Sequence, residues 1–171
     1  MTTEQSTAVT LRRARTPDVR RIREIVGPYV ENRILVAKQN VAYYEGLQEF
    51  RIAEVDGEIA GVGALHVMWD DLAEVRTLAV DAKYRGHKVG HALLEQLIAD
   101  AKEIGVRRVF CLTFEVTFFE QHGFAEIEGT PVTPDVYVEL LHSHDDGVAE
   151  FLDLARVKPN TLGNSRMLLT F

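Results

Sequence analysis

Cysteine is almost absent from this sequence, and so is any long apolar run. The one cysteine, Cys111, has no partner for a disulfide within the chain, which fits a reducing compartment. No stretch reaches the roughly 18 consecutive apolar residues that a membrane-spanning helix needs. Residues 1–10 are polar and lack the apolar core of a secretory signal. We therefore expect a cytoplasmic protein.

Positive charge is also scarce. The chain has 19 Lys and Arg residues against 26 Asp and Glu residues, which gives a net charge of −7. This balance argues against non-specific binding to nucleic acid and against docking on an anionic membrane. It leaves room for small anions held in a local basic pocket. The histidines have no spacing with Cys or acidic residues that resembles a zinc site, so we expect no metal.

Length and composition fit one ordinary globular domain. The 171 residues are 46% hydrophobic and 26% charged, and a chain of this size buries a core without disulfide or metal. We expect residues 1–8 to form a disordered polar tail and residues 9–171 to form a single domain, since no repeat, low-complexity segment or linker interrupts them.

Periodicity and turn signals predict an α+β domain in which helices are layered on a central, mostly antiparallel sheet. Thr16-Pro17-Asp18 indicates a helix start with a hydroxyl cap, and Gly27-Pro28 is expected to end or kink that helix. Asp56-Gly57 between two β-type runs predicts a hairpin. The expected strands are Val9–Arg12, Phe50–Val55, Ile59–Trp69, Ala73–Val80, Val109–Thr113, Phe124–Ile127 and Arg166–Leu169. The expected later helices are Asn40–Glu49, Lys88–Ile104, Thr117–His122, Pro134–Leu141 and Gly147–Leu154.

The segment after Val80 has the features of an anion site. Gly86 and Gly90 lie at the start of the long helix, where amide N–H groups have no intrahelical partner and the helix dipole favours negative charge. Glycine also allows a ligand to approach the backbone closely. The side chains that add charge or donors around this point are Arg85, His87, Lys88 and His91. A phosphate site and a solvated surface loop both remain compatible with the pattern.

Two motifs resemble the GCN5-related N-acetyltransferases. Tyr84-Arg85-Gly86 and Val89-Gly90 match the pyrophosphate loop (Arg/Gln)-x-x-Gly-x-(Gly/Ala), with Lys88 in place of the middle glycine. Phe118–Phe124 matches Phe-Tyr-x-x-x-Gly-Phe, with Phe119 at the tyrosine position. The resemblance implies that family's fold, with acetyl-CoA as co-substrate. It assigns to acetyl-CoA binding Leu78, Ala79, Val80, Arg85, Gly86, His87, Lys88, Val89, Gly90, His91, Phe118 and Phe119, the last two as core residues that also wall the cofactor.

Further segments are similar to the acetyltransferase domain of the N-acetylglutamate synthases, most of all in its short, stand-alone bacterial form. The likeness to that domain lies in Arg33–Lys38, Leu72–Val80, Val109–Thr113 and Asn164–Leu168. The likeness to its short form lies in His66, Trp69, Gly129–Thr133 and Lys158–Arg166, and the resemblance covers about residues 9–170. It implies direct acetyl transfer from acetyl-CoA to the α-amine of L-glutamate, the first step of arginine biosynthesis. It also implies that no amino-acid-kinase-like domain is present. Candidate homodimer surfaces are Glu128–Asn164 and Arg166–Leu169.

The same resemblance suggests the catalytic residues. Glu74 matches the position of the proposed general base, which takes a proton from the attacking ammonium, and a water relay is the alternative. The non-catalytic interpretation is a carboxylate exposed on the strand, or one paired with Arg76. The leaving thiolate needs a donor, and Phe119 has no acidic proton to give. Either Thr113, Thr117 or a water molecule takes that role, or the thiolate leaves with stabilisation by the backbone alone.

A dicarboxylate acceptor needs cations at both ends, because a desolvated carboxylate without a partner is costly. The resemblance places in the acceptor site Arg33, Lys38, Arg76, Thr77, Lys158, Asn164, Ser165 and Arg166. Lys38 and Arg166 are the leading candidates because they lie inside matched motifs. Asn164 stands where the long synthases tend to carry an arginine, so L-glutamine is the second candidate acceptor.

Other functions stay open at this point. One is transfer to a different amine, such as an amino-acid analogue, a polyamine or a protein N-terminus. Another is CoA binding without turnover, as a sensor or as a partner of a separate kinase-like subunit. Cys111 is interpreted as a small core residue, and a ping-pong route through its thiol is the alternative mechanism.

Overall fold

The computed structural model describes residues 8–171, so residues 1–7 of the expected tail lie outside the described part of the chain. Within residues 8–171, seven strands form one mixed sheet in the order β1-β2-β3-β4-β5-β7-β6. The strands are β1 Val9–Arg13, β2 Phe50–Val55, β3 Glu58–Trp69, β4 Leu72–Val80, β5 Arg108–Thr113, β6 Ala125–Ile127 and β7 Ser165–Thr170. The helices are α1 Val19–Glu31, α2 Asn40–Glu45, α3 Val89–Ile104, α4 Val116–Glu120, α5 Pro134–Leu140, α6 Asp146–Phe151 and α7 Lys158–Thr161.

The chain divides into two compact units. The first runs to Leu65 and resumes over Val75–Asp100. The second comprises His66–Glu74 and Ala101–Phe171. β3 and β4 therefore each pass from one unit to the other within a single strand.

In the first unit, β1, β2 and β3 are antiparallel neighbours. Asp56 and Gly57 join β2 to β3 with φ angles of 51° and 78°. A type I′ hairpin turn requires positive φ at both central residues, which Asp-Gly accommodates. The hairpin predicted from this dipeptide is confirmed.

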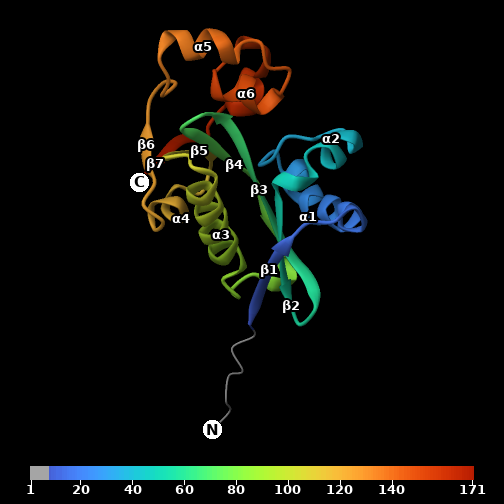
Figure 1. Cartoon of the computed structure of the whole chain (residues 1–171). Coiled ribbons are helices and arrows are strands. Elements are labelled where there is room, and N and C mark those ends of the chain that lie inside the picture. The colour runs from blue at the N-terminus through green and yellow to red at the C-terminus, as the bar shows by residue number, and fades with distance from the viewer. Residues whose placement is uncertain (1–7) are drawn as a thin grey trace. The chain divides into compact units, whose positions relative to one another are not determined.

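The strands of the first unit carry helices on both faces (Figure 1). Ile52 and Val62 pack with Ile22 of α1 in one buried cluster. Gly61, the neighbour of Val62, points to the other face, where an added Cβ would lie 2.7 Å from Val89 Cγ1 of α3. The glycine therefore sets how closely α3, and the loop before it, approaches the sheet.

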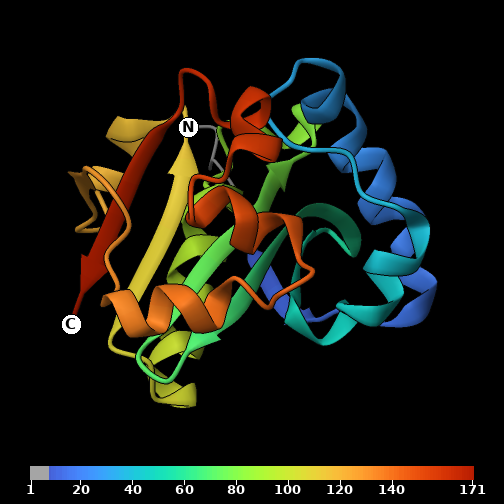
Figure 2. The same ribbon diagram turned by 90° about the horizontal axis from the view of Figure 1, so that it is seen from above.

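In the second unit, β5 lies between β4 and β7. It pairs in parallel with β4 over Leu72–Glu74 and antiparallel with β7, whose other edge pairs with β6 (Figure 2). Phe110 of β5 is fully buried, and its ring meets Phe151 of α6 edge to face with centroids 4.9 Å apart. The expected α+β architecture is confirmed, with β4–β5 as a parallel pair.

The predicted cap of the first helix is wrong, and the helix does not end at Gly27-Pro28, which was one of the two outcomes expected there. Thr16 does not cap it, because the turn begins after Arg15, whose N–H donates to the Asp18 carboxylate at 2.7 Å. The helix also continues through Gly27-Pro28 to Glu31. Glycine before proline has no Cβ to clash with the ring, which leaves the helical conformation accessible.

Other boundaries differ less. The helix expected over Asn40–Glu49 ends at Glu45 and is followed by a 3-10 turn, Leu47–Glu49. Lys88 precedes α3 instead of beginning it. No prediction covered α7, because a helix of 4 residues is too short to show a hydrophobic period.

Gly61→Ala is expected to lower the free energy of unfolding by about 1–3 kcal/mol, the usual cost of overpacking. The new methyl group overlaps Val89 Cγ1 and lies 3.1 Å from the Ala79 carbonyl oxygen. Chemical denaturation measures the change. An unchanged unfolding midpoint would show that α3 moves away from β3 without cost.

Candidate active site

The backbone of β4 is irregular at Thr77. This residue has a φ of 54°, a left-handed conformation that β-branched residues rarely adopt. Thr77 is 7% exposed, and its hydroxyl oxygen accepts a hydrogen bond from Lys38 Nζ at 3.1 Å. Backbone strain of this kind costs about 1–3 kcal/mol and clusters at functional sites. The irregularity therefore supports a functional role for the middle of β4.

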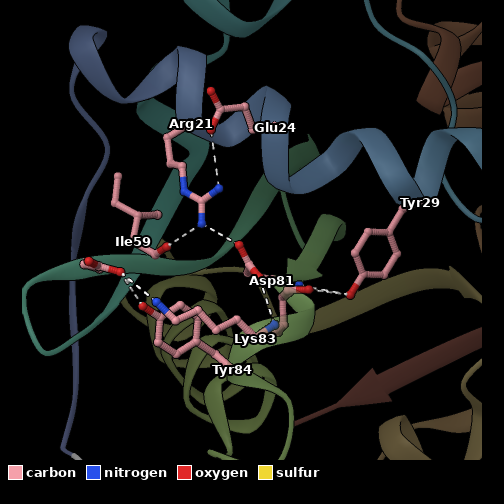
Figure 3. A network of polar contacts seen from close by, with 9 residues as sticks. Arg21, Glu24, Tyr29, Ile59, Asp81, Lys83 and Tyr84 are labelled. Atoms are coloured by element: carbon pink, nitrogen blue, oxygen red, sulfur yellow. Dashed lines mark hydrogen bonds and ion pairs between the residues drawn. The ribbon is translucent and has the colours of Figure 1, made fainter.

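Beyond Thr77 the two edges of β4 have different partners. The Asp81 N–H donates to the Ala60 carbonyl of β3 at 2.8 Å. Backbone groups of successive strand residues point to opposite edges. The N–H and C=O of Val80 accordingly point away from β3. On that opposite edge, both groups are hydrogen-bonded to the Tyr29 hydroxyl of α1 (Figure 3).

The chain leaving β4 is anchored by charged side chains (Figure 3). The Asp81 carboxylate accepts the Lys83 N–H at 2.9 Å, which caps the following 3-10 helix, and it also pairs with Arg21 of α1. The Lys83 N–H first, and then Arg21, hold the pKa of Asp81 below its usual value. Tyr84 donates to Glu58 Oε2 at 2.7 Å. The start of the loop is thus fixed from both α1 and β3.

The loop itself, Arg85–Lys88, is exposed and contains two left-handed residues. Gly86 has a φ of 86° and Lys88 a φ of 59°, and α3 begins at the next residue, Val89. The N–H groups of the first helical turn, which have no partner within the helix, therefore lie next to basic side chains. This arrangement is suited to binding a phosphate group. The expected turn forms although lysine replaces a glycine of the motif.

In the second unit, Glu74 of β4 is buried near Cys111 of β5. Glu74 is 4% exposed and pairs with Phe110 in the parallel ladder. Burial, and secondly the charge of Glu74, raise the pKa of the Cys111 thiol well above its usual value. The thiol stays protonated near neutral pH, which argues against a nucleophilic role.

Thr113 ends β5, and the two adjacent phenylalanines lie in α4. Thr113 is buried, and its hydroxyl oxygen accepts the Glu115 N–H at 2.8 Å, so the hydroxyl can still donate its own proton. Phe119 packs edge to face against Phe118 and Phe124, with centroids 5.2 Å apart in both pairs. Phe119 is 5% exposed, so its predicted core position is confirmed.

Arg166 of β7 has partners inside the second unit. Its Nε donates to the Gly129 carbonyl at 2.9 Å and its Nη1 to the Glu150 carbonyl at 3.3 Å. Its Nη2 donates to the Phe151 carbonyl. The guanidinium lies 5.0 Å from the centroid of the Phe110 ring, and burial lowers the pKa of Arg166. The side chain therefore joins β7 to the segment before it.

The remaining predicted acceptor residues differ in their surroundings. Lys158 pairs with Asp153 at 2.6 Å. Arg33 is exposed and has a φ of 58° just after α1. Half-buried positions are occupied by Arg76, Asn164 and Ser165. Among these predicted residues, the structure joins Lys38 and Thr77 directly.

Sequence reasoning missed Tyr29 and Arg21. Both fit the helical pattern of α1, and neither belongs to a motif that marks it. Their partners at β4, Val80 and Asp81, lie 51 and 60 residues further along the chain. Folding alone brings them together, so no local signal would have revealed them.

Two absences concern the described residues, 8–171. None of their helices is both long enough and apolar enough to cross a membrane. They also contain no group of three or more His, Cys, Asp or Glu side chains placed to hold a metal ion.

The model of the acetyltransferase (GNAT) family matches residues 18–124, which include β4, the loop and α4. The chain belongs to this family. An amino-acid acetyltransferase of Mycobacterium tuberculosis is 54% identical over 162 residues, which cover 93% of this chain and 92% of that protein. Membership identifies the chain as an acetyltransferase, the enzyme class that the loop motif implied.

Solved structures agree with this membership. A Mycobacterium tuberculosis protein crystallised with CoA and NLQ has a TM-score of 0.92 and 53% identity, over 95% of this chain and 99% of that one. N-acetylglutamate synthase from Neisseria gonorrhoeae, solved with CoA and N-acetyl-glutamate, has a TM-score of 0.75 at 22% identity, and this chain spans 35% of it. The second likeness concerns the fold alone, and the predicted fold is confirmed.

Lys88→Gly is expected to stabilise this acetyltransferase. The substitution removes a side chain from left-handed backbone at φ 59°. We expect a net gain of about 0.5–1 kcal/mol after the greater unfolded-state freedom of glycine is subtracted. Thermal unfolding measures it, with Lys88→Ala as the matched control that loses the charge and keeps the strain. A glycine variant less stable than the alanine variant would contradict this account of the loop.

Proposed function

We propose that this enzyme transfers the acetyl group of acetyl-CoA to the α-amine of L-glutamate or L-glutamine by direct attack, the first step of arginine biosynthesis. The strand–loop–helix unit of β4 and α3 carries the proposal, because two left-handed residues and basic side chains precede the helix. The amino-acid acetyltransferase at 54% identity supports the acceptor class, and the neighbour crystallised with CoA supports the donor.

Acetyl-CoA binds along the end of β4 in this proposal. The pantetheine arm pairs with the backbone of Leu78–Val80, and the pyrophosphate lies against the loop and the first turn of α3. Arg85 and Lys88 supply charge to the phosphates, for which charge-assisted hydrogen bonds are strong. The other proposed contacts are Gly86, His87, Val89, Gly90, His91, Phe118 and Phe119.

The chemistry requires two proton movements. The acceptor amine arrives as an ammonium, and we assign removal of its proton to Glu74, directly or through water. The amine lone pair then attacks the thioester carbonyl, and the C–S bond breaks as the carbonyl re-forms. The nitrogen loses its second proton, which reaches the departing sulfur through the hydroxyl of Thr113 or Thr117, or through water, so that the relaying group ends with its own proton restored. The Thr113 hydroxyl supports this role because it accepts the Glu115 N–H and keeps its own proton to donate.

Lys38 is the proposed anchor for an acceptor carboxylate. Its Nζ lies 3.1 Å from the Thr77 hydroxyl and 5.8 Å from the centroid of the Phe50 ring, which holds it at the irregular point of β4. Arg166 already donates to three backbone carbonyls, so its proposed part is to shape the segment before β7. The remaining proposed acceptor contacts are Arg33, Arg76, Lys158, Asn164 and Ser165.

We further propose that residues 9–171 form one acetyltransferase domain that works in the cytoplasm. The buried, unbridged Cys111 is consistent with a reducing compartment. Homodimerisation through Glu128–Asn164 and Arg166–Leu169 is the proposed assembly, which analytical ultracentrifugation tests.

Release of free thiol from acetyl-CoA by the purified protein tests the activity. The acceptors are L-glutamate, L-glutamine, L-aspartate, a polyamine or none, and mass spectrometry identifies the product. We expect turnover with glutamate or glutamine. The ratio of the two rates shows which acceptor is preferred by a site that contains Asn164. Acetyl-CoA binding without turnover on any acceptor would contradict the proposal and favour a non-catalytic CoA-binding module.

Lys38→Met is expected to raise the KM for the amino-acid acceptor about 10- to 100-fold, since a hydrogen bond to a charged group is lost. The KM for acetyl-CoA should change little. Lys102→Met is the matched control, because Lys102 lies over the Phe171 ring at 5.0 Å and is assigned no part in the reaction. If both substitutions change the KM for the acceptor equally, Lys38 does not bind the acceptor.

Cys111→Ala is expected to keep most of the turnover. The thiol is 1% exposed and its pKa is raised by burial, so it supplies no thiolate for a covalent route. Steady-state kinetics at varied acetyl-CoA and acceptor concentrations should give intersecting lines for both proteins. Parallel lines, together with loss of turnover in the variant, would favour the ping-pong route.

A further inference from the structure

Tyr29 makes an unusual pair of hydrogen bonds with the end of β4. Its hydroxyl donates to the Val80 carbonyl at 2.9 Å and accepts the Val80 N–H at 3.1 Å (Figure 3). One hydroxyl thus satisfies both backbone groups of a strand residue. The ring comes from α1 and packs beside the buried cluster that includes Ile22 and Ile52.

A ligand that pairs with this edge of β4, as an added strand would, forms its hydrogen bonds with these same N–H and C=O groups of Val80. The Asp81 N–H bonds Ala60 of β3, so the groups of Val80 point to the opposite edge of β4. In the proposed function the pantetheine arm pairs with the backbone of Leu78–Val80, and at Val80 that pairing falls on this edge. A single N–H does not make two full-strength hydrogen bonds in the same direction, so Tyr29 and pantetheine compete for Val80.

Tyr29 is also bonded to the segment that follows α1. Its carbonyl accepts the Ile34 N–H at 2.8 Å and the Leu35 N–H at 3.1 Å. This segment leads to Lys38, whose Nζ reaches Thr77 in the middle of β4. The side chain of Tyr29 therefore holds the end of β4 while its backbone holds the segment that carries the proposed acceptor residues.

We propose that Tyr29 is an exchangeable partner of Val80 that couples the two substrates. Acetyl-CoA takes over the N–H and C=O of Val80, the Tyr29 hydroxyl is released, and the segment around Ile34 and Leu35 loosens to admit the amino acid. Tyr29 is a positioning residue, since it touches neither reacting atom. The inference rests on the proposed function, and it predicts that acetyl-CoA binds before the acceptor.

Tyr29→Phe gives a test in which the direction of the effect is informative. The variant keeps the ring and removes the competing hydroxyl, so acetyl-CoA should bind about 3- to 10-fold more tightly by calorimetry, the worth of about one hydrogen bond. The KM for acetyl-CoA should fall while kcat stays within about twofold of the wild type. A merely structural bond would leave the affinity unchanged or weaken it, and either result would overturn the proposal.

Tyr137→Phe is the matched control. The Tyr137 hydroxyl donates to the Leu152 carbonyl at 3.1 Å in the second unit, so this variant also loses one tyrosine–backbone bond. Its affinity for acetyl-CoA should stay at the wild-type value. Tighter binding in both variants would mean that general loosening, and not competition for Val80, causes the effect.

Hydrogen exchange on the wild-type protein tests the coupling without any substitution. Saturating acetyl-CoA should speed exchange of the Ile34 and Leu35 amides, because the Tyr29 carbonyl that accepts them is freed to move. Unchanged or slower exchange at both amides would overturn the coupling. A wild-type protein that does not bind acetyl-CoA at all would instead contradict the proposed function, so the two failures are distinguishable.

Discussion

Thr77 interrupts β4 with a left-handed backbone conformation, and the rest of the candidate site is arranged around this point of the strand. A β-branched residue takes that conformation at a cost, so its neighbours must compensate. Lys38 binds the hydroxyl, and the strand resumes with Val80 bonded on one edge to Tyr29. The nine residues of β4 thus include the buried carboxylate of Glu74 and Thr77, whose hydroxyl binds the Lys38 ammonium. They also include Val80, whose backbone is hydrogen-bonded to Tyr29.

Charged side chains fix the turn that leads from β4 to the loop before α3. Ion pairs near the protein surface contribute little stability. The partly buried pair of Arg21 and Asp81 therefore matters mainly for the geometry of the turn after β4. Asp81 joins α1 to the 3-10 turn after β4, and Tyr84 joins the same turn to Glu58 of β3. With the turn held in place, the loop that follows presents its left-handed residues and basic side chains at the start of α3.

The sequence predicts those features that a few adjacent residues determine. Asp56-Gly57 specifies a hairpin because both residues tolerate positive φ, and the Arg85–His91 motif indicates the loop before α3 even with Lys88 in place of glycine. Pro28 misled the prediction, because Gly27 removes the Cβ that would normally clash. The conformation of Thr77 and the partners of Arg166 escaped prediction for a different reason. They arise from contacts between distant segments, which no local pattern encodes.

The central claim is that the end of β4 and the loop before α3 form the cradle for acetyl-CoA. Backbone NMR of the labelled protein during titration with acetyl-CoA tests it most directly. We expect the largest amide shifts on Leu78–Val80 and on Gly86–His91. Saturable binding that leaves these amides unmoved, with the largest shifts elsewhere in the chain, would contradict it.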